Sequence, residues 1–174
     1  MLRLLRPLLV SLLLIAPSAF AEALYQVELI VFRQAEKPLN ASQPSPEDWA
    51  GNALTIAPES ERGPALTGDA EKLAGKGYQI VLHKAWQQGV GSSPAPVRFV
   101  TGKERDGHFP VEGVLDLTQG RQLELNLQTW VNQFNRDGFL ASSERLQIQR
   151  RLIPGQPTYL DHPSIGALIR VTPL

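Results

Sequence analysis

The chain has 174 residues, 17 basic and 17 acidic side chains, and no cysteine. Without cysteine it can form no disulfide, offer no thiol nucleophile, and carry no lipid on a cysteine that follows a signal sequence. The balanced charge argues against nucleic acid as a partner, because proteins that bind nucleic acid usually show a basic excess or a basic stripe.

The first 21 residues have the pattern of a cleaved secretory signal peptide. Arg3 and Arg6 precede an apolar core at residues 8–15, and Ala19-Phe20-Ala21 is a small-x-small cleavage site. The apolar core is shorter than the ~20 residues that a membrane span needs. We therefore expect residues 22–174 to be an exported single domain that is not an integral membrane protein after cleavage.

The first predicted element of this domain is a strand at residues 25–33, where apolar residues alternate at first and then occupy both faces. Residues 34–66 contain five prolines and predict a long loop that is either flexible or functional. Trp49 is expected to pin this loop to the domain surface, with ligand stacking as the alternative. A short helix is predicted at residues 69–77 and a strand at 78–87.

The clearest alternation lies in two runs, residues 111–117 and 123–131, on either side of a turn at Gln119-Gly120. This pattern predicts an antiparallel hairpin with one apolar and one polar face. Further strands are predicted at residues 97–101, 144–153 and 165–172. Together these elements predict an α+β fold. Its twisted, mostly antiparallel sheet of six or seven strands would have its apolar face covered by the helix and the Pro-rich loop.

Catalytic and metal-binding signatures are missing from the sequence. His83, His108 and His162 are far apart and show no metal-ligand spacing, and there is no Gly-x-Ser-x-Gly motif. Asp161 and His162 are neighbours, but neighbouring side chains on an extended chain point to opposite sides. We predict no catalytic residue, no metal and no cofactor. A hydrolase with paired carboxylates from distant segments stays open as an alternative.

Arg150 shares its parity with the apolar residues of its strand, so burial would require a carboxylate partner. Glu28 and Asp161 are the candidates, and a bidentate pair would fix the turn before the last strand. In the functional alternative, Arg150 and Arg151 join Tyr159 and His162 in a shallow site for a ligand with carboxylates and sugars. The rings offered for sugar stacking would be those of Trp86, Trp130 and Tyr159, although aromatic residues on strands are more often core.

Several short blocks occur in a characteristic order. They are Tyr25 to Glu28 with Ile30 to Phe32, Glu47-Asp48-Trp49, Tyr78 to Gln87 with His83 and Trp86, Val111-Glu112-Gly113, Arg150-Arg151, and Tyr159 to Pro163 with Gly166 and Arg170 to Pro173. In this order and spacing they resemble the CsiV family of periplasmic peptidoglycan-binding proteins. The resemblance spans nearly the whole of residues 22–174.

The resemblance implies a non-enzymatic periplasmic protein of the Gram-negative envelope that binds peptidoglycan and supports cell-wall assembly. A cell-wall synthase or its activator would be a further partner. The candidate ligand-binding residues are His83, Trp86, Arg150, Arg151, Tyr159 and His162, and the candidate structural residues are Glu28, Asp161 and Gly166. Two other functions stay open: an envelope hydrolase acting on cell-wall glycan or peptide, and an adaptor that binds another envelope protein through residues 34–66.

Overall fold

The computed structural model describes residues 22–34, 43–161 and 163–174. The predicted signal peptide (residues 1–21) and His162 lie outside these residues. The strands of the described part are β1 (Ala23–Gln34), β2 (Leu54–Thr55), β3 (Tyr78–Val90), β4 (Val97–Thr101), β5 (Val111–Gln119), β6 (Leu123–Phe134), β7 (Leu140–Leu152), β8 (Thr158–Asp161) and β9 (Ile165–Pro173). Its helices are α2 (Thr67–Gly75) and a short 3₁₀ helix, η1 (Pro58–Ser60). No helix of this part is long and apolar enough to cross a membrane.

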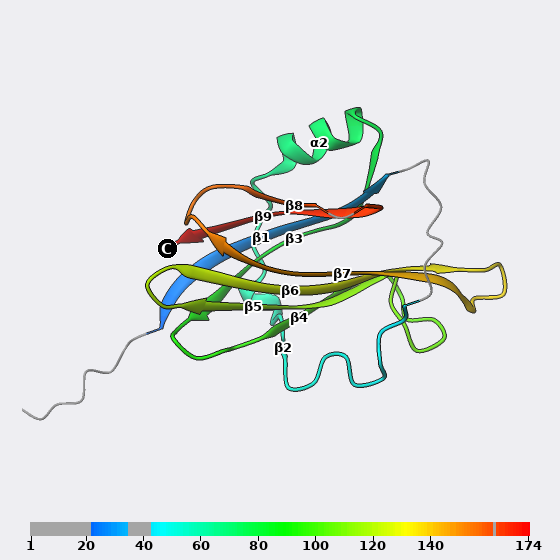
Figure 1. The fold of residues 1–174 in the computed structure, drawn as a ribbon, viewed down its shortest axis with the longest axis horizontal. Helices are drawn as coiled ribbons and strands as arrows, with labels where there is room; N and C mark the ends of the chain where they lie inside the picture. Colours follow the sequence, from blue (N-terminus) through cyan, green and yellow to red (C-terminus); the bar gives the residue numbers. More distant parts are fainter. Residues whose placement is uncertain (1–21, 35–42, 162) are drawn as a thin grey trace, which may run out of the picture.

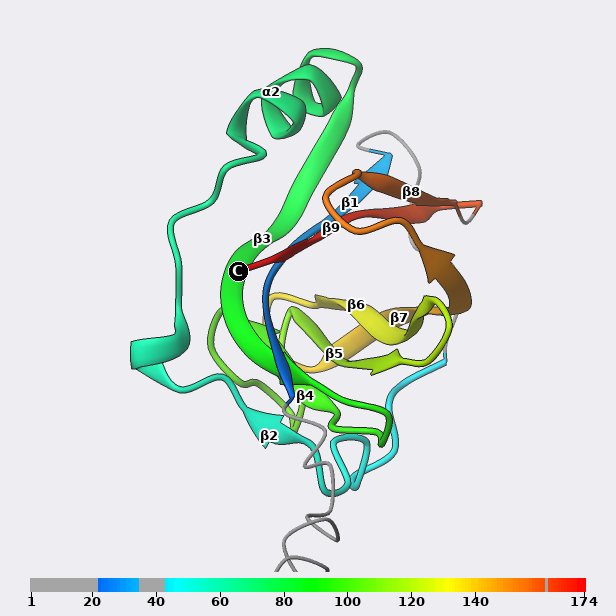
Figure 2. The same cartoon turned by 90° about the vertical axis from the view of Figure 1, so that its left-hand side faces the viewer.

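The strands form two sheets that pack against each other (Figures 1 and 2). The four-stranded sheet has the order β3-β1-β9-β8, and all its neighbours are antiparallel. The five-stranded sheet has the order β2-β4-β5-β6-β7, in which the short pair β2–β4 is parallel and the rest are antiparallel. The prediction of one sheet with six or seven strands is therefore wrong. Alternation shows which face of a strand is buried, but it does not show which strands are partners.

The main core lies between the two sheets. Val27, Leu29 and Val31 of β1 belong to the same buried cluster as Leu125 and Leu127 of β6. Burying such side chains contributes about 2 kcal/mol each. Each sheet thus covers the apolar face of the other, whereas the helix and the Pro-rich loop were predicted to cover it.

Helix α2 instead covers the outer face of the four-stranded sheet (Figure 2). Ile30 and Phe32 of β1 pack there with Leu66 and with Ala70 of the helix. This arrangement confirms that the later part of the first strand is covered on both faces, because Leu29 and Val31 face the main core while Ile30 and Phe32 face the helix. The β5–β6 hairpin is also confirmed, with Gln119 paired to Leu123 at its turn.

Gly166 lies directly opposite Phe32 in the ladder between β9 and β1. A Cβ atom at residue 166 would lie 2.7 Å from the Phe32 ring, so only glycine leaves room for that ring. The ring of Phe32 then contacts Tyr78 and Tyr159, with centroid distances of 5.2 and 5.5 Å.

The described part of the Pro-rich loop, residues 43–66, lies against the domain. The amide of Gln43 donates to the Ser143 carbonyl at 3.0 Å. The ring of Trp49 meets that of Trp130 edge-on at a centroid distance of 6.2 Å. The prediction that Trp49 pins the loop to the domain surface is thus confirmed.

Candidate functional site

The polar side chains of the β5–β6 hairpin and of β7 share one outward face of the five-stranded sheet. They form two rungs in register: Asp116, Asn126 and Gln149 are paired across the three strands, and so are Thr118, Glu124 and Arg151. Because the two rungs are two residues apart on each strand, their side chains point to the same side of the sheet, about 7 Å from one another. We call these six residues the polar face.

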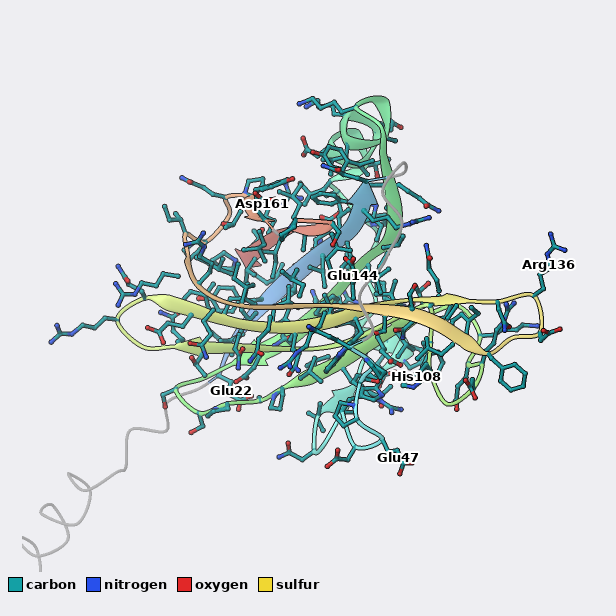
Figure 3. The ribbon with its side chains drawn as sticks, turned by 45° about the vertical axis from the view of Figure 1, so that its right-hand side comes forward. Glu22, Glu47, His108, Arg136, Glu144 and Asp161 are labelled. Atoms are coloured by element: carbon teal, nitrogen blue, oxygen red, sulfur yellow. The ribbon has the colours of Figure 1, made fainter. Side chains whose placement is uncertain are left out.

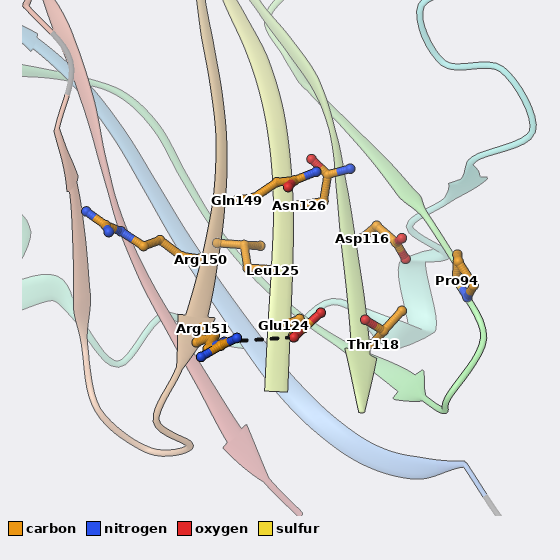
Figure 4. Close-up of a pocket in the computed structure, with 9 residues that line it drawn as sticks. All are labelled: Pro94, Asp116, Thr118, Glu124, Leu125, Asn126, Gln149, Arg150 and Arg151. Carbon is orange, nitrogen blue, oxygen red and sulfur yellow. Dashed lines mark ion pairs between the residues drawn. The ribbon is translucent and has the colours of Figure 1, made fainter. Parts of the chain in front are cut away.

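The polar face borders a hollow of about 430 Å³ (Figure 4). Its lining comprises the polar face together with Pro94, Leu125 and Arg150. A second hollow, of about 550 Å³, is lined by Arg121, Gln122, Glu124 and Arg151 at the β5–β6 turn. Since both hollows share Glu124 and Arg151, the open surface continues from the middle of the sheet to its turn.

The charges of the polar face are only weakly engaged within the protein. Arg151 Nε lies 4.0 Å from Glu124 Oε1, and these side chains are 75% and 61% exposed. An exposed pair at this separation contributes little to stability. Asp116 is held more firmly, because its Oδ1 accepts the backbone amide of Ala95 at 3.0 Å. The surface therefore offers a guanidinium, two carboxylates and two amides that a ligand can reach.

Arg150 does not make the predicted buried ion pair. It is exposed on β7, and in the described part of the chain it forms no ion pair with Glu28 or Asp161. Its guanidinium extends to the opposite side of the strand from Gln149 and Arg151 (Figure 4). The prediction failed because β7 is an edge strand of its sheet. At this edge the inward-facing Arg150 reaches solvent, although Leu146 and Leu152 on the same side of β7 are buried.

Glu28 has other partners, which close the outer face of the four-stranded sheet. Its Oε1 accepts the amides of Ala65 and Leu66 at 2.9 and 2.7 Å and lies 2.7 Å from His83 Nε2. Its Oε2 accepts from Arg170 Nη2 at 3.2 Å. The Glu28 carboxylate is 1% exposed, so it fastens the segment before α2 to three strands. His83, a candidate ligand-binding residue, is engaged in this cluster.

Two opposing effects set the pKa of Glu28. Burial is the largest and raises it, because the charged form is desolvated. The hydrogen bonds from His83, Leu66 and Ala65 favour the carboxylate and together hold the pKa below its usual value of 4.5. The ionised form of Glu28 is therefore part of the folded structure.

The tryptophans proposed for sugar stacking are inside the protein. Trp86 is 1% exposed in the main core, and its Nε1 donates to Gln88 Oε1 at 2.7 Å. Trp130 is 2% exposed and is covered by Trp49 and by the guanidinium of Arg145, 5.8 Å from its ring. Neither ring is accessible to a sugar, so the structure corrects both hypotheses.

Tyr159 and Asp161 lie on β8, in the other sheet from the polar face. The labelled Asp161 and His108 mark opposite sides of the sandwich in Figure 3. Burial raises the pKa of Tyr159 to about 12, helped by a hydrogen bond with Tyr78 and by the charge of Asp161. Tyr159 is 45% exposed and can still be reached by a ligand. Tyr159 and Arg151 thus lie in different sheets, and His162, the fourth residue proposed for that site, lies outside the described residues.

At the end of the five-stranded sheet away from the β5–β6 turn, residues 43–50 and the loop before β5 cover the outer face. Glu112 is fully buried there, where its Oε1 accepts from Ser45 Oγ at 2.6 Å and from Asn132 Nδ2 at 3.0 Å. His108 Nδ1 lies 3.0 Å from the same oxygen. These partners occupy the Glu112 carboxylate, so it is not available to a ligand.

Arg151 was predicted from the sequence as a site residue, but its neighbours Asp116, Glu124, Asn126 and Gln149 were not. A signal was present, because the hairpin shows a regular polar side. Their convergence with Arg151 could not be read from the sequence, since it depends on the register between β6 and β7. No group of three or more His, Asp or Glu side chains arranged to hold a metal ion occurs in residues 22–34, 43–161 and 163–174.

One family model matches the chain over nearly its whole length. The family model described as "Peptidoglycan-binding protein, CsiV" matches residues 4–67 and 52–174, which together run from residue 4 to the last residue given. This match confirms the resemblance carried by the sequence blocks. No curated protein and no solved structure matches the chain.

Proposed function

The chain belongs to the CsiV family of peptidoglycan-binding proteins, and from this premise we propose that it is a non-enzymatic periplasmic protein that binds peptidoglycan and supports cell-wall assembly. The observation that carries the proposal is the family match along nearly the entire chain. The signal-peptide pattern of residues 1–21 supports export to the compartment where peptidoglycan lies.

The polar face is the surface that supports this function best. Peptidoglycan is a hydrophilic polymer with many hydrogen-bonding groups and free carboxylates, and the face presents exposed amides and Arg151 beside a hollow. Arginine is well suited to carboxylates because its planar fork can donate two parallel hydrogen bonds. The outer face of the other sheet offers less, since Glu28 and His83 are engaged with each other and with the protein backbone.

A supporting role in wall assembly would follow from placing a second envelope protein near its substrate. A cell-wall synthase or its activator is the partner that we propose. Binding of the domain to the wall polymer and to such a protein together would raise their effective local concentration. In the described part of the loop through which an adaptor would bind, residues 43–66, Ser45 and Trp49 are engaged in contacts within the domain and are not available to this partner.

The test is co-sedimentation of purified residues 22–174 with isolated sacculi at low salt, with analysis of the soluble products. We expect the protein in the pellet and no release of muropeptides. Protein that stays in the supernatant would refute peptidoglycan binding. Released muropeptides would identify a hydrolase and refute the non-enzymatic assignment.

A further inference from the structure

We infer that the polar face binds the peptide stems of peptidoglycan rather than its sugar backbone, an inference that rests on the proposed function. Peptidoglycan offers two chemically different parts: a chain of amino sugars, and short peptides that carry free carboxylates and, where a diamino acid is present, a free amine. The side chains around the hollow discriminate between these parts.

The hollow has no platform for a sugar ring. Protein sites for sugars commonly use an exposed aromatic ring against the apolar side of the sugar, and none of the described residues that line this hollow is aromatic. The nearest large rings of the same sheet face belong to Trp130 and Trp49, which pack on each other at the closed end. A sugar chain would meet mostly polar side chains there, in competition with water, and the apolar residues of the lining, Pro94 and Leu125, offer no flat ring.

The charges fit a ligand that carries both signs. Glu124 and Arg151 lie side by side in one rung, and Asp116 lies in the next. A carboxylate of the stem can pair with Arg151, with Arg121 of the adjoining hollow nearby. An amine of the same stem can pair with Glu124 or Asp116. The sugar backbone, whose hydroxyl and acetamido groups are neutral, would leave all of these charges unused.

The spacing also suits a short extended peptide. The rungs are about 7 Å apart, which is the repeat of two residues in an extended chain. Asn126 and Gln149 stand in one rung and can each donate to and accept from a peptide group. An extended stem lying along the strands would thus meet amides at one rung and opposite charges at the next.

The weak pairing of Glu124 with Arg151 favours exchange with a ligand. Their separation of 4.0 Å and high exposure mean that little free energy is lost when each turns to a charge on the ligand. The backbone under them is a regular antiparallel ladder, so the surface is formed before the ligand arrives. Binding then requires ordering of a few side chains only.

Calorimetric titration with three probes tests the inference. The probes are a stem tetrapeptide that contains a diamino acid, the same peptide with its side-chain amine acetylated, and glycan strands stripped of peptides by an amidase, with the lactyl carboxylates that this cleavage exposes converted to neutral amides. We expect the tetrapeptide to bind, acetylation to weaken it about tenfold through loss of one charge-assisted contact, and stripped strands to bind much more weakly than intact sacculi.

Two variants locate the site, and a third serves as their control. Arg151→Ala and Glu124→Gln should each weaken tetrapeptide binding about tenfold. Arg136→Ala removes the same charge from an exposed residue in the loop between β6 and β7, at the opposite end of these strands from the β5–β6 turn beside the polar face (Figure 3). It should leave the affinity within about twofold, because a charge that makes no direct contact is largely screened in salt solution.

The outcomes separate this inference from the proposed function. If stripped strands bind as tightly as intact sacculi, stem recognition is refuted while peptidoglycan binding stands. Equal losses in the Arg136 and Arg151 variants, or no loss in either, would refute the polar face as the site. If neither sacculi nor any probe binds, the proposed function itself fails.

Discussion

The two outer faces of the sandwich use charged residues in opposite ways. On the four-stranded sheet, Glu28 is buried beneath the segment before α2 and holds His83, Arg170 and two backbone amides. On the five-stranded sheet, Glu124 and Arg151 stand in solvent 4.0 Å apart. Similar residue types on similar strands are thus bound into the structure on one face and left accessible on the other.

This difference shows that a charged residue indicates a binding site only when its partners are known. A buried carboxylate with four hydrogen-bonding partners contributes to the fold, because its removal leaves those partners unsatisfied. An exposed and loosely paired carboxylate contributes little to the fold and is available to a ligand. Single substitutions on the two faces should therefore change the free energy of unfolding by very different amounts.

Replacing Glu28 by alanine should have the largest effect. The change leaves Arg170, His83 and the amides of Ala65 and Leu66 without their acceptor, and such a loss costs about 3 to 5 kcal/mol. Urea unfolding followed by circular dichroism measures it. Glu28→Gln is the milder control, since its carbonyl oxygen can still accept. If Glu28→Ala unfolds at the wild-type urea concentration, the closed face does not stabilise the domain as we describe.

Replacing Gly166 by alanine should destabilise the domain by about 2 kcal/mol. The added Cβ would lie 2.7 Å from the Phe32 ring, so the ring or the strand must move within a packed layer. Gly155→Ala is not a suitable control because Gly155 has a positive φ, whereas Gly63, with open space around its Cα, is suitable. A stability of Gly166→Ala equal to that of Gly63→Ala would show that Phe32 adapts without cost.

Acid should weaken the closed face through Glu28. Its pKa is lowered in the folded state, so ionised Glu28 contributes stability at pH values above its unfolded pKa, close to 4.5. That contribution is lost as the pH falls through the lower, folded pKa. The free energy of unfolding measured from pH 6 down to pH 3 should fall more steeply for the wild type than for Glu28→Gln. Parallel curves would contradict a stabilising role for the Glu28 charge.

Replacing Glu124 by alanine should have the smallest effect on the fold, within about 0.5 kcal/mol of the wild-type free energy of unfolding. Glu124 is 61% exposed and its contact with Arg151 is long. The same urea unfolding assay measures this change. A loss as large as that of Glu28→Ala would remove the distinction between the two faces.

Local patterns in the sequence predicted much of the fold. The β5–β6 hairpin and the two-sided burial of β1 follow from alternation, which depends only on neighbouring residues. The pairing of β1 with β9 joins segments about 140 residues apart, and alternation carries no information about such partners. The short strand β8 was not predicted, because only four residues form it. The division into two sheets was missed for the same reasons.

The candidate site was predicted less well, because it depends on register and burial. Arg151 was named, but Glu124 joins it only through the β6–β7 register. A tryptophan such as Trp86 can stack against a sugar ring, but at its position on β3 this side chain points into the core. Glu28 was expected to pair with an arginine and does so, but the arginine is Arg170, its direct neighbour across β1 and β9.

The most direct test of the account is sacculus co-sedimentation of a charge-swap variant, Glu124→Arg with Arg151→Glu, beside Asp161→Asn. The swap leaves the net charge unchanged but exchanges the charges along the polar face, while Asp161 lies in the other sheet. We predict that the swap variant stays folded and is lost from the pellet, and that Asp161→Asn sediments like the wild type. A swap variant that sediments fully would contradict the assignment of peptidoglycan binding to the polar face.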